Sequence, residues 1–284
     1  MIRCLSLLLL ALCLAGPAAA ETTECTNITT LPTVISTQGI YCLKQDLSTA
    51  ITTGAAITIA TNNVTIDCNG RKLGGLAAGP GTQTTGIHAT TKQNITVRDC
   101  NIRGFRAGLL FDRYGNNYSG GHLVENNLFD ANTMVGIELS GDYVTARRNR
   151  VINTGGTTLL GDIIALAVSG QPALADDNYV GGVTGSTDAS ADTIGLRVSG
   201  YMSLARDNVV TDVNAGSGTS ASIAAGGTQI TLEHNSVFNV GTPPQYGVDT
   251  TYSSVLCINN RVRGYTINAY DECDNGGGNY PAIP

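Results

Sequence analysis

The 284-residue sequence contains no tryptophan, only 8 prolines, and few charged side chains, which make up 13% of the chain. It has 16 Lys and Arg against 22 Asp and Glu and no basic run, so it lacks the electrostatic footprint of a nucleic-acid-binding protein. No Cys-x-x-Cys pair occurs and the 3 histidines are scattered, which argues against a structural zinc site. Gly, Thr, Asn and Val are abundant instead, a mixture that disfavours helices and favours short strands joined by tight turns.

The first 20 residues have the pattern of a secretory signal peptide. Arg3 precedes an apolar run, and Ala18 to Ala20 provide a small-residue cleavage site. The run is too short to span a bilayer stably, and no later stretch approaches roughly 18 apolar residues, so we expect no membrane span. The sequence therefore predicts a protein secreted to the extracellular space or the periplasm.

Six cysteines remain once Cys4 and Cys13 leave with the signal peptide. An even number in an oxidising compartment indicates disulfides, although six cysteines allow about fifteen pairings. Local pairs are the simplest prediction: Cys25 with Cys42, Cys68 with Cys100, and Cys257 with Cys273. The alternative is that some of them are free buried thiols.

A repeated segment is the strongest feature of the sequence. Ser140-Gly141 and Ser169-Gly170 are each followed, eight residues after the glycine, by an asparagine in an apolar-x-x-Asn-x-apolar pattern. The repeated position, which is a cysteine in the first unit, falls at residues 100, 127, 149, 178, 208, 235 and 260. Units of 22 to 30 residues without helical periodicity each predict one coil of a β-solenoid.

Each unit also contains a second strand in which apolar residues alternate with variable ones, as in Gly136-Ile137-Glu138-Leu139. Stacked inward aliphatic side chains are expected to form a continuous core. The repeated asparagine has a structural explanation, because asparagine tolerates left-handed backbone angles and its amide bonds to nearby main-chain groups. Repeated once per coil, these amides are expected to stack as a ladder.

The recurring unit resembles the parallel β-helix repeat of the pectin-lyase-like superfamily over roughly residues 60 to 268. The resemblance implies a right-handed coil, which periodicity alone does not show. We predict an all-β, right-handed parallel β-helix of about eight to nine coils. The predicted divisions are a signal peptide (1–20), an N-terminal cap (21–60), the β-helix (61–268) and a C-terminal cap (269–284).

One outward column, two residues before the asparagine, alternates in charge at every coil. It consists of Asp67, Arg98, Glu125, Arg147, Asp176, Arg206 and Glu233. The resemblance places this column on the functional face, since a similar position in pectate lyases carries calcium-binding acids and a catalytic arginine. Calcium needs several carboxylates without interleaved cations. We therefore predict a structural ladder of ion pairs and no cofactor, with adventitious calcium as the alternative.

The next outward column contains the predicted catalytic centre. Asp177 and Asp207 are expected to be close neighbours, with Arg148 on one side and His234 on the other. Paired carboxylates beside a histidine can perform acid–base chemistry, because like charges push one pKa up. Arg148 would neutralise an acidic sugar. The alternative is a solvated turn edge with ordinary ion pairs.

Asp162 and Asp192 form a second-choice catalytic pair at the starts of two equivalent strands. Polygalacturonases place paired aspartates at comparable strand starts, but neither strand start carries their Asp-Asp pair, and their Gly-His-Gly and Arg-x-Lys motifs are absent here. The Asp-Pro-His-Asp signature of mannuronan epimerases is absent as well. An aspartate that closes a turn before a strand is the alternative for both residues.

The sequence thus predicts a secreted protein that interacts with extracellular or cell-surface polysaccharide. In one hypothesis it also cleaves the polymer as a lyase or hydrolase. In the other it is a non-catalytic adhesin or structural surface protein, which the missing signatures favour, since the superfamily includes both kinds. The expected partner is a glycan; nucleic-acid binding and a membrane span are not expected, and the oligomeric state is left open.

Overall fold

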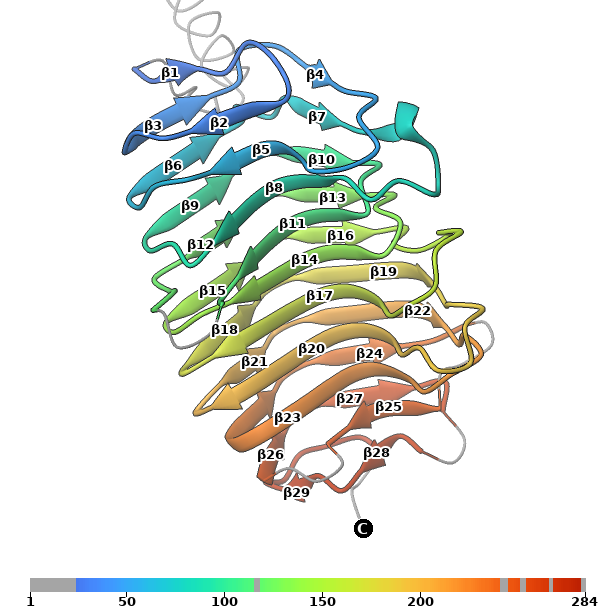
Figure 1. Cartoon of the computed structure of the whole chain (residues 1–284). Helices are drawn as coiled ribbons and strands as arrows, with labels where there is room; N and C mark the ends of the chain where they lie inside the picture. Colours follow the sequence, from blue (N-terminus) through green and yellow to red (C-terminus); the bar gives the residue numbers. More distant parts are fainter. Residues whose placement is uncertain (1–23, 115–117, 241–244, 251–253, 266–267, 282–284) are drawn as a thin grey trace, which may run out of the picture.

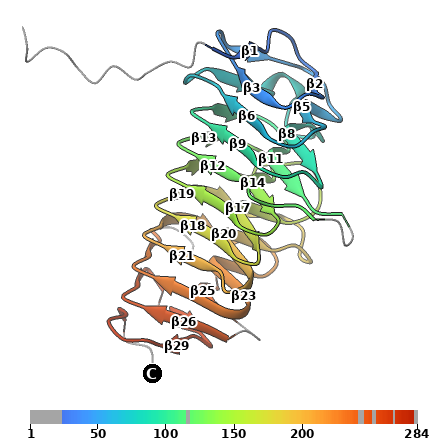
Figure 2. The same cartoon turned by 90° about the vertical axis from the view of Figure 1, so that its left-hand side faces the viewer.

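The computed structural model describes residues 24–114, 118–240, 245–250, 254–265 and 268–281. The predicted signal peptide, residues 1–20, lies outside the described residues. The strands form three parallel ladders along one stack of coils, which confirms the predicted all-β solenoid (Figure 1). Figure 2 shows this stack from the side, with β1 at one end and β29 at the other.

Each coil contributes about one strand to each ladder, and the ladders are named A, B and C. Ladder A contains β2 (Thr33–Ile35), β5 (Ala55–Ile59), β8 (Thr85–Thr90), β11 (Ala107–Asp112), β14 (Val135–Ser140), β17 (Ile163–Gly170), β20 (Thr193–Tyr201), the first part of β23 (Ser220–Glu233), β25 (Tyr246–Asp249) and β28 (Tyr270–Asp271). Ladder B contains β1 (Thr26–Asn27), β3 (Gly39–Cys42), β6 (Val64–Asp67), β9 (Ile95–Arg98), β12 (Leu123–Glu125), β15 (Val144–Arg147), β18 (Ala173–Asp176), β21 (Leu204–Arg206), the second part of β23, β26 (Ser254–Ile258) and β29 (Asp274–Asn275).

Ladder C contains β4 (Leu47–Ser48), β7 (Lys72–Gly74), β10 (Asn101–Arg103), β13 (Leu128–Asp130), β16 (Arg150–Ile152), β19 (Tyr179–Thr184), β22 (Val209–Asn214), β24 (Ser236–Phe238) and β27 (Arg261–Arg263). A short 3-10 helix, η1 (Leu76–Ala78), follows β7. No helix in the described part of the chain is long and apolar enough to cross a membrane.

The core lies between the three ladders. In β11, Leu109 and Phe111 are fully buried, whereas Leu110 and Asp112 face outward. Leu109 pairs in register with Ile87 and Ile137 of the neighbouring strands, so aliphatic side chains stack along the axis. Each coil covers the inward side chains of the next, because a single coil cannot remove them from water.

The segments expected to form the caps contribute strands to the same ladders. Strands β1 to β5 lie within residues 21–60, and β3 pairs with β6 through Tyr41 and Ile66. Strands β28 and β29 lie within residues 269–284 and pair with β25 and β26. The boundaries between caps and solenoid stay a prediction.

All three predicted disulfides are present: Cys25–Cys42, Cys68–Cys100 and Cys257–Cys273. The second of them joins successive coils, with Cα atoms 4.7 Å apart. The other two tie the chain segments near the two ends of the stack to ladder B.

The repeated asparagines form the predicted stack, and each buried amide is fully bonded. Asn149 donates its backbone N–H and its Nδ2 to Asn178 Oδ1, at 3.0 and 3.1 Å, and Nδ2 also donates to the carbonyl of Val124. The same pattern runs from Asn127 to Asn260 and ends on Asn279, one rung beyond the predicted positions. Asn127 to Asn260 are at most 2% exposed.

The predicted alternating charge column is in register across ladder B. Each of its arginines bonds to the acid of the preceding coil at 2.8 Å: Arg98 to Asp67, Arg147 to Glu125, and Arg206 to Asp176. The prediction of a structural ladder of ion pairs is therefore confirmed.

His122 is buried at the turn before β12 and is only 2% exposed. Its Nδ1 accepts the Ile95 N–H at 3.3 Å, its Nε2 lies 3.2 Å from the Ser119 hydroxyl, and its ring packs edge-on against Phe111. Burial lowers the pKa of His122 to about 4, and a hydrogen bond that the ring donates to the Lys92 backbone opposes this more weakly. The folded state therefore holds this imidazole neutral.

We expect the free energy of unfolding to fall as the pH drops from about 6.5 to about 4, because the unfolded histidine binds a proton in this window and the folded one does not. His122 accounts for up to about 3 kcal/mol of that fall. His122→Asn keeps an acceptor for Ile95 but cannot titrate. Urea unfolding at a series of pH values should give a shallower pH dependence for this variant, and parallel curves would contradict the assignment.

Candidate functional site

The four residues of the predicted catalytic centre lie in the turns between ladders B and C. Arg148, Asp177, Asp207 and His234 all have left-handed backbone angles, with φ between 51° and 55°. Asp99, Asn126 and Asn259 share the same conformation at the equivalent positions of other coils. Asp, Asn and His are the residues that tolerate this conformation best. The residue types on which the prediction relied therefore have a conformational explanation.

The structure brings only part of this column together. His234 Nδ1 lies 3.9 Å from Asp207 Oδ1, with side chains 53% and 56% exposed. Arg148 points away from Asp177 and donates to Asn126 at 2.9 Å and to Glu125 at 3.1 Å. Three cavities of about 250, 280 and 590 Å³ are found among the described residues, and none of these four side chains contributes to their walls. A catalytic role at these turns stays a prediction.

The second-choice pair is brought together at the edge of ladder A. The Asp192 N–H donates to Asp162 Oδ1 at 2.9 Å, and Arg197 donates to Asp192 Oδ2 at 3.3 Å. Burial raises the pKa of Asp192, Asp162 adds to the rise and Arg197 opposes it. Asp192 thus holds Arg197 in place over the outer face of ladder A.

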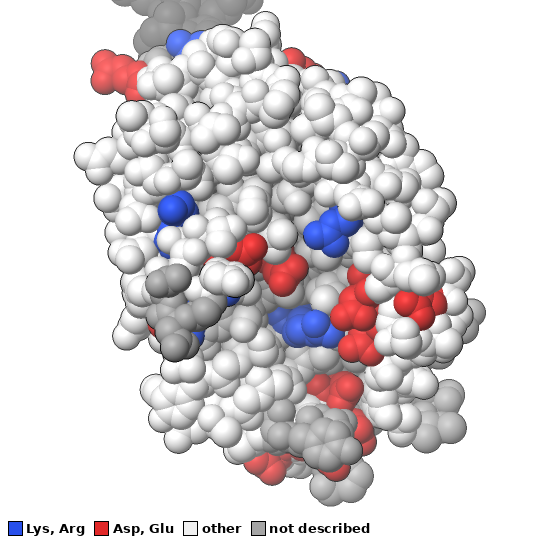
Figure 3. Space-filling model, viewed as in Figure 1, with Lys and Arg blue, Asp and Glu red and all other residues white. Residues whose placement is uncertain are grey.

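That outer face carries a column that the sequence reasoning did not identify. From β8 to β28 the outward residues in register are His88, Leu110, Glu138, Ala167, Arg197, Ala224, Asp249 and Asp271. Small Ala167 and Ala224 alternate with the charged residues in the middle of this column. Figure 3 shows acidic and basic side chains gathered in the middle of this face, while its upper part carries few.

Glu138 occupies the centre of this face on β14. Its carboxylate is half-buried, and no hydrogen bond or ion pair to it is found within the described part of the chain. Burial is the main cause that raises its pKa; Arg106 and Arg197 oppose the rise, and Asp112 adds to it. A carboxyl group in this setting tends to keep its proton and can donate it.

Asp112 lies at the end of the neighbouring strand β11, two residues beyond Leu110, which pairs with Glu138. Its Oδ2 is 3.4 Å from His88 Nε2, which is also 3.2 Å from the Thr90 hydroxyl. Its Oδ1 is buried and has no hydrogen-bond partner among the described residues.

Cavities lie at both ends of β14, on either side of Glu138. A cavity of about 590 Å³ beside Met134 is lined also by Arg106 and Leu160. A second, of about 250 Å³, lies by Ser140 and includes Arg113. The two cavities and Glu138 therefore mark a path along one strand. Among the described residues, no group of three or more His, Cys, Asp or Glu side chains is arranged to hold a metal ion.

The sequence contained a usable signal for this face. The second strand of each unit was interpreted only for its inward apolar positions, and the outward ones were treated as variable. A single glutamate between aliphatic residues in Gly136-Ile137-Glu138-Leu139 marked the position, but its charged neighbours lie one or two coils away in the sequence.

A family model described as the right-handed β-helix region matches residues 85–267. The chain belongs to the right-handed β-helix family. This confirms the hand of the coil that the resemblance implied. Among curated proteins, no sequence matches the β-helix chain.

Several solved structures are similar to this β-helix. The Agl-KA catalytic domain is 14% identical, with 87% of this chain and 55% of that chain covered and a TM-score of 0.48. The enzymatically active domain of bacteriophage CBA120 tailspike protein 2 is 12% identical, with 83% and 40% covered and a TM-score of 0.40. The A-module of the Azotobacter vinelandii mannuronan C-5 epimerase AlgE6 is 15% identical, with 88% and 83% covered and a TM-score of 0.41. These similarities carry no information about the activity of this chain.

Proposed function

We propose that this protein is a secreted glycoside hydrolase that binds a polysaccharide across the outer face of ladder A. Glu138 is the general acid and Asp112 is the base. The observation that carries the proposal is the pair of carboxyl groups on adjacent strands in two different environments: one is half-buried without an ion pair, and the other faces His88. A half-buried carboxyl group whose pKa is raised by burial is suited to donate a proton, and a second carboxylate on the adjacent strand can accept one.

The proposed reaction needs a proton donor, a base and water. Glu138 gives its proton to the glycosidic oxygen as the bond from that oxygen to the anomeric carbon breaks. Asp112 removes a proton from the water whose oxygen bonds to the anomeric carbon. From the register, adjacent strands about 4.8 Å apart and a two-residue offset place the two Cα atoms about 8 Å apart. Side chains that leave the same face at this Cα spacing can hold their carboxyl groups on either side of a water molecule, the arrangement of hydrolases that invert the anomeric configuration.

Arg197 and Arg106 flank Glu138 and set the charge of the site. Arg197 is oriented by Asp192, so it presents a fixed cation to the substrate face. A fixed cation stabilises negative charge that develops on Glu138 as it loses its proton. Asp162 and Asp192 thus act as positioning residues in this proposal.

Two further features support an extracellular protein that acts on an extended ligand. The predicted signal peptide and three disulfides support export into an oxidising compartment. The path along β14, with open cavities at both ends, suits a linear polymer better than a small metabolite enclosed on all sides.

The test is cleavage of neutral and acidic polysaccharides by the purified oxidised protein, measured as new reducing ends. We expect at least one polymer to be cut, with the activity lost in Asp112→Asn and kept in Asp177→Asn. Asp177 is the matched control, because asparagine is equally tolerated at its left-handed turn. Loss of activity in Asp177→Asn instead would move the centre to the turns between ladders B and C.

A second candidate function is non-catalytic surface binding, and ladder B favours it. Its outward column next to the charge column consists of Ile40, Thr65, Thr96, Leu123, Thr145, Leu174, Leu204, Thr231 and Leu256. This strip carries no titratable group and runs along nearly the whole stack. Absence of new reducing ends with every polymer would favour this function.

A further inference from the structure

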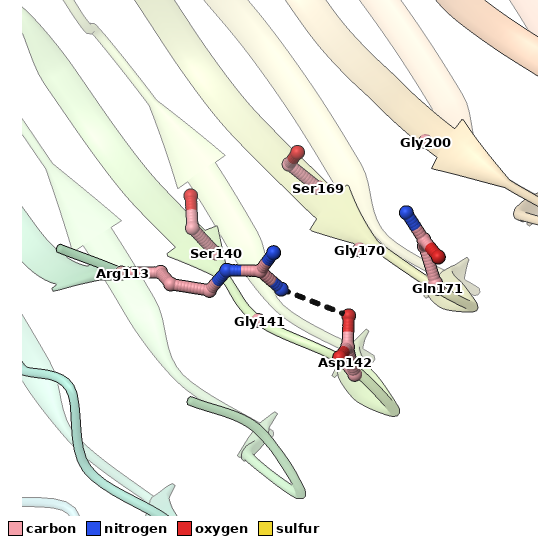
Figure 4. A pocket seen from close by; sticks show the side chains of 8 residues that line it. All are labelled: Arg113, Ser140, Gly141, Asp142, Ser169, Gly170, Gln171 and Gly200. Atoms are coloured by element: carbon pink, nitrogen blue, oxygen red, sulfur yellow. Dashed lines mark hydrogen bonds and ion pairs between the residues drawn. The ribbon is translucent and has the colours of Figure 1, made fainter. Parts of the chain in front are cut away.

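We propose that the cavity at the end of β14 is a subsite that holds one neutral sugar unit of the substrate (Figure 4). It is lined by Arg113, Ser140, Gly141, Asp142, Ser169, Gly170, Gln171 and Gly200. The proposal rests on the proposed function, because it places this unit beside the glycosidic bond whose oxygen Glu138 protonates.

The subsite continues the same outer face. Asp112 and Ser140 directly follow the paired residues Phe111 and Leu139, and Ser140 pairs with Ser169. The base and two serine hydroxyls therefore form one outward column over consecutive coils. Figure 4 shows the side chains of Ser140, Ser169, Arg113 and Gln171 around a common space. A sugar that enters this space next to Asp112 meets donors and acceptors from three coils.

The glycines leave the cavity open. A Cβ atom on Gly170 would overlap the carbonyl oxygen of Gly141, and one on Gly200, where φ is +118°, would overlap that of Gly170. The close stacking of the three backbones therefore admits no side chain at these positions. As a result, the floor of the cavity is made of bare main chain between the serine column and Gln171.

The charges in the subsite cancel, which selects a neutral sugar. The Arg113 guanidinium donates to Asp142 Oδ1 at 3.3 Å (Figure 4). An arginine already paired with a carboxylate offers no free positive charge to a uronate, and Asp142 would repel one. Paired guanidinium and carboxylate groups still offer donors and acceptors in one plane, which match vicinal hydroxyl groups. Ser140, Ser169 and the Gln171 amide add further partners for hydroxyls.

The size of the cavity limits the subsite to one unit. About 250 Å³ is below the roughly 300–1,000 Å³ of pockets that enclose a whole drug-sized ligand. The remainder of the polymer then lies along β14, past Glu138 and towards the cavity beside Arg106.

The experiment is isothermal titration calorimetry of the oxidised protein with defined hexasaccharides. The neutral probes are cellohexaose, laminarihexaose, maltohexaose and mannohexaose, and the acidic probe is hexagalacturonate. We expect at least one neutral probe to bind, with Kd raised about 3- to 10-fold by Ser169→Ala or Gln171→Ala, since each removes about one hydrogen bond. Ser236→Ala is the matched control on the outer face of ladder C, where we expect Kd to be unchanged.

Three results would overturn the subsite: no neutral probe binds, a neutral probe binds equally to the wild type and both variants, or hexagalacturonate binds through Ser169 and Gln171. If cleavage depends on Asp112 but binding is unchanged in the Ser169 and Gln171 variants, the subsite proposal is wrong and the proposed function still holds. Binding that depends on Ser169 and Gln171 without any cleavage would remove the hydrolase function and keep a glycan site.

Discussion

Glu138→Gln is expected to lower kcat for polysaccharide cleavage by about 10³-fold, within the usual range for loss of a general acid. Glutamine keeps the shape of the side chain but has no proton to give to the leaving oxygen. Substrate affinity should change little, since the cavities at both ends of β14 are untouched. Initial rates and calorimetric binding, measured on the same preparation, separate these two effects.

The pH profile provides an independent check of this role. Because burial raises the pKa of Glu138, the carboxyl stays protonated above the pH at which an exposed glutamate ionises. Activity should therefore fall as the pH rises through that raised pKa, and Glu138→Gln should lose this alkaline limb. Glu233→Gln, at the end of the charge column on ladder B, is the matched control. A variant at Glu138 that keeps wild-type kcat would exclude the residue as the acid.

Asn178→Ala is expected to lower the free energy of unfolding by about 4 kcal/mol, because buried donors left without an acceptor cost about 1–3 kcal/mol each. The change removes the Oδ1 that accepts both the backbone N–H and the Nδ2 of Asn149. It also removes the Nδ2 that donates to Ala146 and Asn208. Both Asn149 donors are buried in the stack, so water does not replace the lost acceptor.

Denaturant unfolding monitored by circular dichroism measures this loss. Asn279→Ala removes the acceptor for Asn260 in the same way, but at the half-exposed end of the stack, where water can take its place. We expect it to cost less than half as much. Equal losses for both variants would mean that burial of the stack does not determine its contribution.

The repeated features could be predicted from the sequence because they recur at every coil. The asparagine stack and the alternating charge column follow from aligning units of 22 to 30 residues, whereas the three disulfides follow from pairing each cysteine with its neighbour in the sequence. Once the register is known, neighbours across coils are known too. A column that holds one residue type, or one alternating pattern, can therefore be recognised from the aligned sequence alone.

The candidate site on ladder A is not repeated, which is why the sequence did not reveal it. Glu138, Asp112 and Arg197 come from three coils, and the residue types in their two columns change from coil to coil without a repeating pattern. The Asp and His residues at the turns were more conspicuous, since the left-handed conformation selects those types in coil after coil. The repeated Asp and His residues therefore reflect the left-handed backbone conformation of the turns. The proposed catalytic residues lie on the outer face of ladder A, where no residue type repeats.

The asparagine stack also gives the molecule a direction. In every rung the donors belong to the earlier coil and the acceptor to the later one, from Asn127 through to Asn279. The amide dipoles therefore add along the axis and polarise one another. During synthesis from the amino end, the asparagine donors of the newest coil have no acceptor until the next coil supplies its asparagine oxygen. The stack can therefore be extended only towards the carboxyl end. Removal of coils from that end would leave the donors of the last remaining asparagine without an acceptor.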